Sequence, residues 1–168
     1  MDLLQQVPMT FNHVNAGLVA GTTSTYTTTA TTVCSIGGRF ATGLTAQTNT
    51  ASPTTDANTG LAFPTLSANQ ATVLVWGINA AGAIRLVQGS IVPTEVGVTT
   101  TAGNFINAPS FPAIPDDFCP IGYLLIQAGS TADATTGWIF GTSNMSSVTG
   151  ITYTFVDIST VPDRPQGS

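Results

Sequence analysis

The sequence predicts an all-β fold, either an antiparallel β-sandwich or a jelly-roll-like barrel, with an extended N-terminal arm and an extended C-terminal tail. The first basis is threonine: the 168 residues include about thirty threonines, whose β-branched side chains disfavour helices and suit pleated strands. The second is a series of short apolar or alternating segments separated by turn residues, and roughly eight such strands suit a sandwich or a barrel. The third is that no segment has helical periodicity over more than about two turns.

The chain is long enough for one domain, which would bury about two thirds of the surface of its unfolded form. Residues 1–20 are predicted to form the arm, because Pro8 limits any helix there to a short turn. Residues 21–159 contain the strand patterns and form the predicted β domain. Residues 160–168, with two prolines, form the predicted tail.

The first part of the predicted domain is polar. Residues 22–32 consist almost entirely of Thr, Ser and Ala around Tyr26, which predicts one or two strands without a large apolar face. Such strands lie at a surface or pack against another subunit. Residues 35–44 predict a further strand, with a bend or bulge at Gly37 and Gly38. Residues 46–60 are rich in Thr, Ser, Asn and Pro and are predicted to form a surface loop.

The core strands are predicted further along the chain. Residues 73–76 are a continuous apolar run, typical of a strand that is covered on both faces, and with 84–87 they predict a hairpin. Residues 123–126 and 138–140 predict two more buried strands. Residues 151–155 alternate apolar and threonine side chains, as expected for a half-buried strand.

Charge is scarce: 7% of the residues are charged, against about 25% in ordinary soluble domains. There is no lysine, and three scattered arginines with a net charge of −5 make a nucleic-acid interface implausible. No run approaches the roughly twenty apolar residues of a membrane span, and Asp2 with Gln5 and Gln6 argues against a signal peptide. We therefore expect a soluble protein made in the cytosol. An uncharged polar surface has little repulsion to keep copies apart, which suits an assembly.

Few residues suggest chemistry, and we expect no catalytic residue, cofactor or metal ligand. His13, the only histidine, has no neighbouring nucleophile and acid in sequence and is interpreted as a surface or contact residue. Asp116 and Asp117 suit a turn better than paired catalytic carboxylates, since successive side chains point apart, although a cation is an alternative. Asp56, within residues 53–60, allows the same two interpretations, with a turn favoured.

Two cysteines and two tryptophans each leave two interpretations open. Cys34 and Cys119 are expected to be buried free thiols, because cytosolic synthesis disfavours a disulfide between them. Trp76 and Trp138 are predicted to lie in the core, since large apolar residues surround both in sequence. The alternative is a platform on which sugars stack.

Three stretches carry a resemblance to a known group of proteins. Residues 103–122 have the sequence GNFINAPSFPAIPDDFCPIG, residues 138–166 contain WIFG, SNMS, TGITYTFVD and VPDRPQ, and residues 53–60 are PTTDANTG. Together they resemble small virion-associated structural proteins of tailed bacteriophages, over about residues 25–168. The resemblance implies a component of the phage particle and brings no catalytic residue with it.

The leading hypothesis is a capsid decoration (cement) protein, located on the head surface of the virion after synthesis in the host cytoplasm. It would be a homotrimer that stabilises the head by binding between subunits of the major capsid protein. A decoration protein is favoured over a tail fibre, because the short chain has no repeat of the kind found in tail-fibre shafts. The arm and the tail would reach the partners. The candidate contact residues are Leu3, Leu4, Met9, Phe11, Val161 and Arg164.

The alternative hypothesis is a tail-associated adhesin or receptor-binding module that contacts a glycan on the host surface. It would need an exposed groove lined with aromatic side chains, for which Trp76 and Trp138 are the candidates. A glycan-degrading enzyme is a weaker third hypothesis, because the sequence has no pair of carboxylates suited to acid–base catalysis.

Overall fold

The structure is a computed structural model, and it describes residues 9–41, 43–98, 101–130, 137–145 and 149–161. Across these ranges the chain forms strands and no helix, which confirms the all-β prediction. The strands are β1 (Phe11–Asn12), β2 (Leu18–Ala20), β3 (Thr25–Thr28), β4 (Cys34–Ile36), β5 (Arg39–Ala41), β6 (Gln47–Ala51), β7 (Gln70–Asn79), β8 (Ile84–Gln88), β9 (Val92–Pro93), β10 (Phe118–Ala128) and β11 (Ile151–Asp157).

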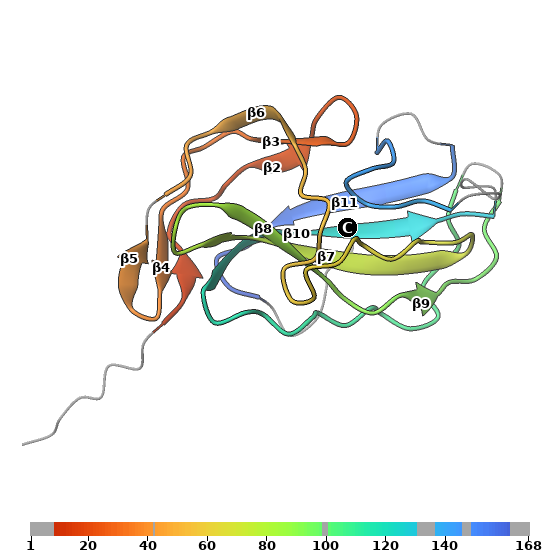
Figure 1. The fold of residues 1–168 in the computed structure, drawn as a ribbon. Helices are drawn as coiled ribbons and strands as arrows, with labels where there is room; N and C mark the ends of the chain where they lie inside the picture. The colour runs from red at the N-terminus through yellow and green to blue at the C-terminus, as the bar shows by residue number, and fades with distance from the viewer. Residues whose placement is uncertain (1–8, 42, 99–100, 131–136, 146–148, 162–168) are drawn as a thin grey trace, which may run out of the picture.

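The strands form three antiparallel sheets (Figure 1). The central sheet has the order β11-β10-β7-β8, with β9 paired to one end of β7. A second sheet, β2-β3-β6, packs over one face of the central sheet, and a small sheet, β1-β4-β5, lies at one end of the molecule. In the part of the chain that is described, the central sheet stays open between β11 and β8, so the fold is sandwich-like and does not close into a barrel.

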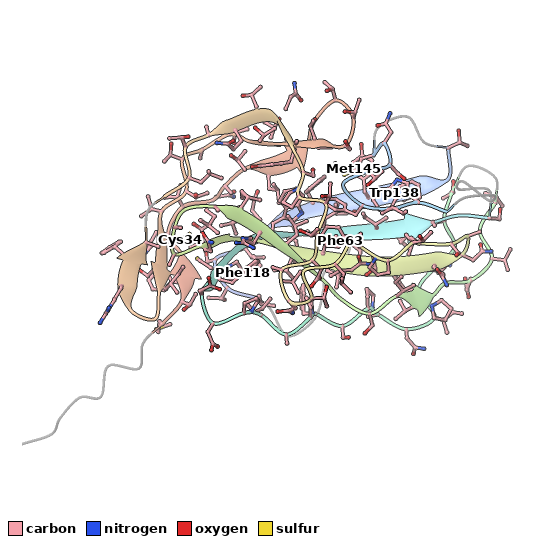
Figure 2. All side chains as sticks on the ribbon, in the orientation of Figure 1. Cys34, Phe63, Phe118, Trp138 and Met145 are labelled. Atoms are coloured by element: carbon pink, nitrogen blue, oxygen red, sulfur yellow. The ribbon has the colours of Figure 1, made fainter. Side chains whose placement is uncertain are left out.

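The core lies on both faces of β7 and β10, as the continuous apolar runs predict. Leu74, Trp76 and Ile78 of β7 face the second sheet and belong to the larger cluster of buried side chains. Val73 and Val75 face the opposite way, into a smaller cluster. Loop side chains complete this core, and Figure 2 shows several of the buried ones. The larger cluster includes Phe63, Leu66, Trp138, Phe140 and Met145, and the smaller one is covered by Phe105, Phe111 and Ile114.

Proline in the middle of β10 is accommodated by an irregularity in the sheet. The register between β10 and β7 shifts between Pro120 and Gly122, so Ile121 is an extra residue of the kind found in a β-bulge. β11 pairs with β10 only from Gly122 to Ala128, so Pro120 lies beyond the end of that ladder. A Cβ on Gly122 would lie 2.9 Å from Leu18 Cδ2, and its absence therefore lets the second sheet approach closely.

The predicted boundary of the N-terminal arm at residue 20 is wrong. Residues 11–12 and 18–20 are strands, and Leu18 is buried in the larger core cluster. The N–H of Asn12 donates to the carbonyl of Ser159 at 2.9 Å, which joins this segment to the end of the domain. The reason is that Ala16 and Leu18 are both apolar and lie two residues apart in an extended segment, so both side chains face the core. Residues 1–8 of the arm and 162–168 of the tail lie outside the described residues.

Three other segments differ from the prediction. Residues 46–60 include β6, which pairs with β3 and is polar because it lies on the outside of the second sheet. Residues 138–140 do not form a regular strand; Trp138 makes a single bridge with Leu66, and its neighbours turn away after it. Residues 35–44 do not form one strand: β4 and β5 pair as an antiparallel hairpin, and Gly37 and Gly38 are its turn, because both adopt positive φ values. The hairpin of β7 and β8 is confirmed.

Asp157, at the end of β11, holds β2 in place. One carboxylate oxygen accepts a hydrogen bond from the N–H of Leu18 at 3.0 Å. Burial raises the pKa of the Asp157 carboxyl above its ordinary value, although hydrogen bonds from the backbone of Leu18 and Gly17 oppose that shift.

This pKa predicts the direction of one pH effect. Between the ordinary pKa of 3.8 and the raised value, the folded chain binds more protons at Asp157 than the unfolded chain, so stability falls as the pH rises. The contribution is fully present below 3.8 and is lost above the folded pKa. In Asp157→Asn, which keeps an acceptor for Leu18, the decline should be absent. Urea unfolding midpoints measured across this pH range test the difference, and parallel curves for the two proteins would contradict it.

Candidate functional site

The small sheet presents a row of three side chains on its outer face. Phe11 of β1, Ser35 of β4 and Phe40 of β5 lie directly opposite one another in the strand register. Opposite residues on neighbouring strands project from the same face, so the two phenyl rings flank the serine. Phe40 is 79% exposed, an unusual position for a large apolar side chain.

His13 lies over this row. Its Nε2 is 2.8 Å from Ser35 Oγ, and its ring centroid lies 4.2 Å from that of Phe11 and 5.3 Å from that of Phe40. The imidazole and phenyl rings thus order one another, and they cover Ser35, which is 6% exposed. We call Met9, Phe11, His13 and Phe40 the aromatic surface; the Met9 carbonyl accepts from the N–H of Gly38, which places Met9 beside the β4–β5 turn.

The aromatic surface adjoins an open strand edge. Among the described residues β5 pairs only with β4, so its outer backbone groups face away from the sheet. Gly37 and Gly38 have φ values of 56° and 77°, and positive φ at both turn positions is what a two-residue type I′ hairpin requires. Exposed edges invite pairing with another chain unless charge or proline protects them. Arg39 is the only charged residue of β4 and β5.

The contact between His13 and Ser35 resembles part of a catalytic triad but lacks its third member. Among the described residues no carboxylate hydrogen-bonds to the imidazole of His13. A triad needs such a group to hold the tautomer and orient the base. The rings of Phe11 and Phe40 lie on either side of the His13 imidazole, so His13 packs between aromatic side chains. This location agrees with the interpretation of His13 as a surface or contact residue.

Asp56 has the role of a turn residue. Its Oδ1 accepts hydrogen bonds from the N–H groups of Asn58 and Thr59 at 2.8 and 3.0 Å, and its Oδ2 accepts one from Gln88 at 2.7 Å. The carboxylate is 6% exposed, and these donors satisfy it without a cation. The favoured interpretation of this segment as a turn is confirmed.

The acidic pair Asp116 and Asp117 is also in a turn. Both residues are exposed, and the N–H of Phe118 donates to the carbonyl of Pro115 at 3.1 Å across them. In the described part of the chain no group of three or more His, Cys, Asp or Glu side chains is placed to hold a metal ion. Nor does any helix in those ranges have the length and apolar character of a membrane span.

Trp76 and Trp138 are core residues, as the favoured interpretation predicts, with exposed fractions of 0% and 1%. Trp76 packs against Tyr26 and Phe140, at ring-centroid distances of 4.8 and 5.7 Å. Neither indole reaches the surface, so these two residues cannot stack on a sugar.

The predicted contact residues have different locations. Met9 and Phe11 belong to the aromatic surface, whereas Leu3, Leu4 and Arg164 lie outside the described residues. Val161 is partly buried and packs against the smaller core cluster, and its role as a contact residue stays a prediction.

Sequence reasoning missed Phe40. The available signal was a large apolar residue two positions after the Gly37–Gly38 pair, between a charged residue, Arg39, and a small one, Ala41. Three further exposed apolar residues, Val96, Val98 and Ile106, follow β9 in the chain. They are aliphatic, and their side chains are not ordered by stacked rings.

No protein-family model, curated protein or solved structure matches this chain. The function must therefore be inferred from the geometry above and from the resemblance in sequence.

Proposed function

We propose that this chain is a structural protein of a bacteriophage virion, a capsid decoration protein that binds between subunits of the major capsid protein through its aromatic surface. The observation that carries the proposal is Phe40, 79% exposed beside the open edge of β5. The sequence resemblance to virion-associated proteins supports the assignment to a phage particle. The aromatic surface offers a means of attachment to that particle.

The chemistry of the aromatic surface suits a protein partner. Aromatic residues and methionine are enriched in protein interfaces, and full burial of a phenylalanine contributes about 1.5–3 kcal/mol. Phe40, Phe11 and Met9 offer three such side chains, with His13 holding the rings in place. Because only 7% of the chain is charged, docking removes few charged groups from water.

The edge of β5 supplies a second element of recognition. An extended segment of the partner can add to an open strand edge through backbone hydrogen bonds, while its side chains meet the pocketed or apolar positions beside it. Phe40 and the open edge belong to the same strand, so one extended capsid segment could engage both. A homotrimer would link three such contacts and multiply their affinity.

The proposal predicts that Phe40→Asp abolishes attachment without unfolding the chain. The substitution removes the apolar contact and places a charge in the interface, which should weaken binding at least about tenfold. Because Phe40 is so exposed, the free energy of unfolding should change by less than about 0.5 kcal/mol. The gene for this chain is deleted from the parent phage, and the wild-type or the variant protein is supplied in its place. Gel densitometry of the purified particles then gives the number of copies of the protein per particle.

Val96→Asp is the matched control, since Val96 is 81% exposed and does not belong to the aromatic surface. Hundreds of wild-type copies per particle, lost with Phe40→Asp and retained with Val96→Asp, would support the proposal. A few copies per particle would place the chain in the tail instead, and no copies would remove it from the virion. Normal decoration by Phe40→Asp would show that the aromatic surface is not the contact.

A further inference from the structure

The inner face of the small sheet holds a cysteine against the central sheet. Side chains alternate along β4, so Ser35 points outward into the aromatic surface and Cys34 points inward. Cys34 belongs to β4 and Cys119 to β10, and both are 0% exposed within the same core cluster. Figure 2 shows Cys34 where the small sheet meets the central sheet.

The two thiols are in direct contact. The side chains of Cys34 and Cys119 lie within hydrogen-bonding reach of each other, where β4 packs against β10. This contact lowers the pKa of the Cys34 thiol, whereas the same contact and burial raise the pKa of the Cys119 thiol. Each sulfur has one further polar neighbour at 3.9 Å, Asn12 Oδ1 for Cys34 and the Pro120 carbonyl for Cys119. Both thiols are free in this structure.

We propose that Cys34 and Cys119 are a site of covalent modification, at which a thiol oxidant joins them in an intrachain disulfide that ties the small sheet to the central sheet. The proposal rests on the contact between two fully buried sulfurs from segments far apart in the sequence. It does not depend on the function of the chain.

The chemistry balances with a disulfide oxidant such as oxidised glutathione. The Cys34 thiolate attacks one glutathione sulfur, which breaks that disulfide, forms a mixed disulfide and releases one glutathione thiolate. The Cys119 thiol loses its proton and its sulfur attacks the Cys34 sulfur, which releases the second glutathione. Two protein thiols are oxidised and one glutathione disulfide is reduced. Because neither sulfur is exposed, the first attack requires the small sheet to open or occurs before folding is complete.

The disulfide should stabilise the chain substantially. It closes a loop of roughly 85 residues, and cross-links of that span restrict the unfolded chain strongly when the native geometry needs little adjustment. For a domain of this size the thermal midpoint should rise by roughly 10 °C.

The experiment incubates the purified full chain with a mixture of oxidised and reduced glutathione, without denaturant and after refolding from urea. The expected product has lost two hydrogen atoms in intact mass, carries no glutathione, migrates faster on a non-reducing gel and melts roughly 10 °C higher. Dithiothreitol should reverse all of these changes. Refolding should oxidise the chain faster than incubation of the native protein, because opening limits the native reaction.

Two alanine variants control the assignment. Cys34→Ala and Cys119→Ala should each leave one thiol that yields at most a glutathione adduct, with no rise in the thermal midpoint. The proposal is overturned if the wild-type chain keeps both thiols free after oxidative refolding, or ends as a glutathione adduct. A disulfide that lowers the thermal midpoint would equally overturn it, since the native sulfurs would then not be placed to bond.

Discussion

Replacing Trp138 with alanine is expected to lower the free energy of unfolding by about 4 kcal/mol. The side chain is 1% exposed and packs against Phe140 at a ring-centroid distance of 6.0 Å. It also anchors a loop over the core, because Trp138 exchanges two backbone hydrogen bonds with Leu66 and its Nε1 donates to the carbonyl of Asn144 at 3.0 Å. Alanine would leave a large cavity and remove the indole hydrogen bond. Urea unfolding followed by far-ultraviolet circular dichroism measures the loss.

Phenylalanine at the two tryptophan positions provides the sharper comparison. Trp76 Nε1 is buried and has no hydrogen-bond partner, whereas Trp138 Nε1 has one. Trp76→Phe removes a buried N–H that has no acceptor, and this gain offsets about 1–2 kcal/mol of the stability lost with the smaller side chain. Trp76→Phe should therefore cost less than Trp138→Phe by about that amount. Equal costs would mean that the Trp76 indole makes a hydrogen bond in solution, for instance to a bound water.

The second large effect is expected at Asp56. Its carboxylate accepts three backbone hydrogen bonds and joins the turn at residues 56–60 to Gln88 of β8, so Asp56→Ala should cost about 3 kcal/mol. Asp56→Asn keeps one acceptor oxygen and should cost about half as much. Asp116→Ala is the control, because that carboxylate is exposed, and it should change stability by less than about 0.5 kcal/mol. Stability that responded to calcium in wild type and not in Asp56→Ala would contradict this assignment of the carboxylate.

The buried centre of the fold was predictable from the sequence, since a continuous run of apolar side chains is stable only where both faces of its strand are covered. Residues 73–76 and 123–126 lie in β7 and β10, both buried, and the alternating residues 151–155 lie in β11. The irregular core was harder. An isolated apolar run such as 138–140 has the same composition in a strand as in a buried loop, and only its partner, Leu66, decides between them.

The outer strands and the candidate site were less predictable because polar residues carry little directional signal. β6 has the sequence QTNTA and is indistinguishable from a loop until β3 lies beside it. The sequence identifies Met9 and Phe11 as candidate contact residues, yet Phe40 joins them only through the register Phe11–Ser35–Phe40. The cysteines were an open question for the same reason, since sequence spacing does not report which strands become neighbours.

The links between the two ends of the domain also govern when this chain can fold. Asn12 hydrogen-bonds to Ser159, and Leu18 to Asp157, so the links that join β1 and β2 to the end of the domain form only after nearly the whole chain has left the ribosome. β7 can pair with β8 early, but its other edge pairs with β10, which follows about forty residues later in the chain. Nascent chains from which β10 and β11 have not yet emerged would therefore leave one edge of β7 unpaired and the apolar face of the second sheet uncovered, and we expect them to bind chaperones and to be digested by proteases. Protection should appear abruptly once β11 has emerged, which stalled-ribosome proteolysis can follow residue by residue.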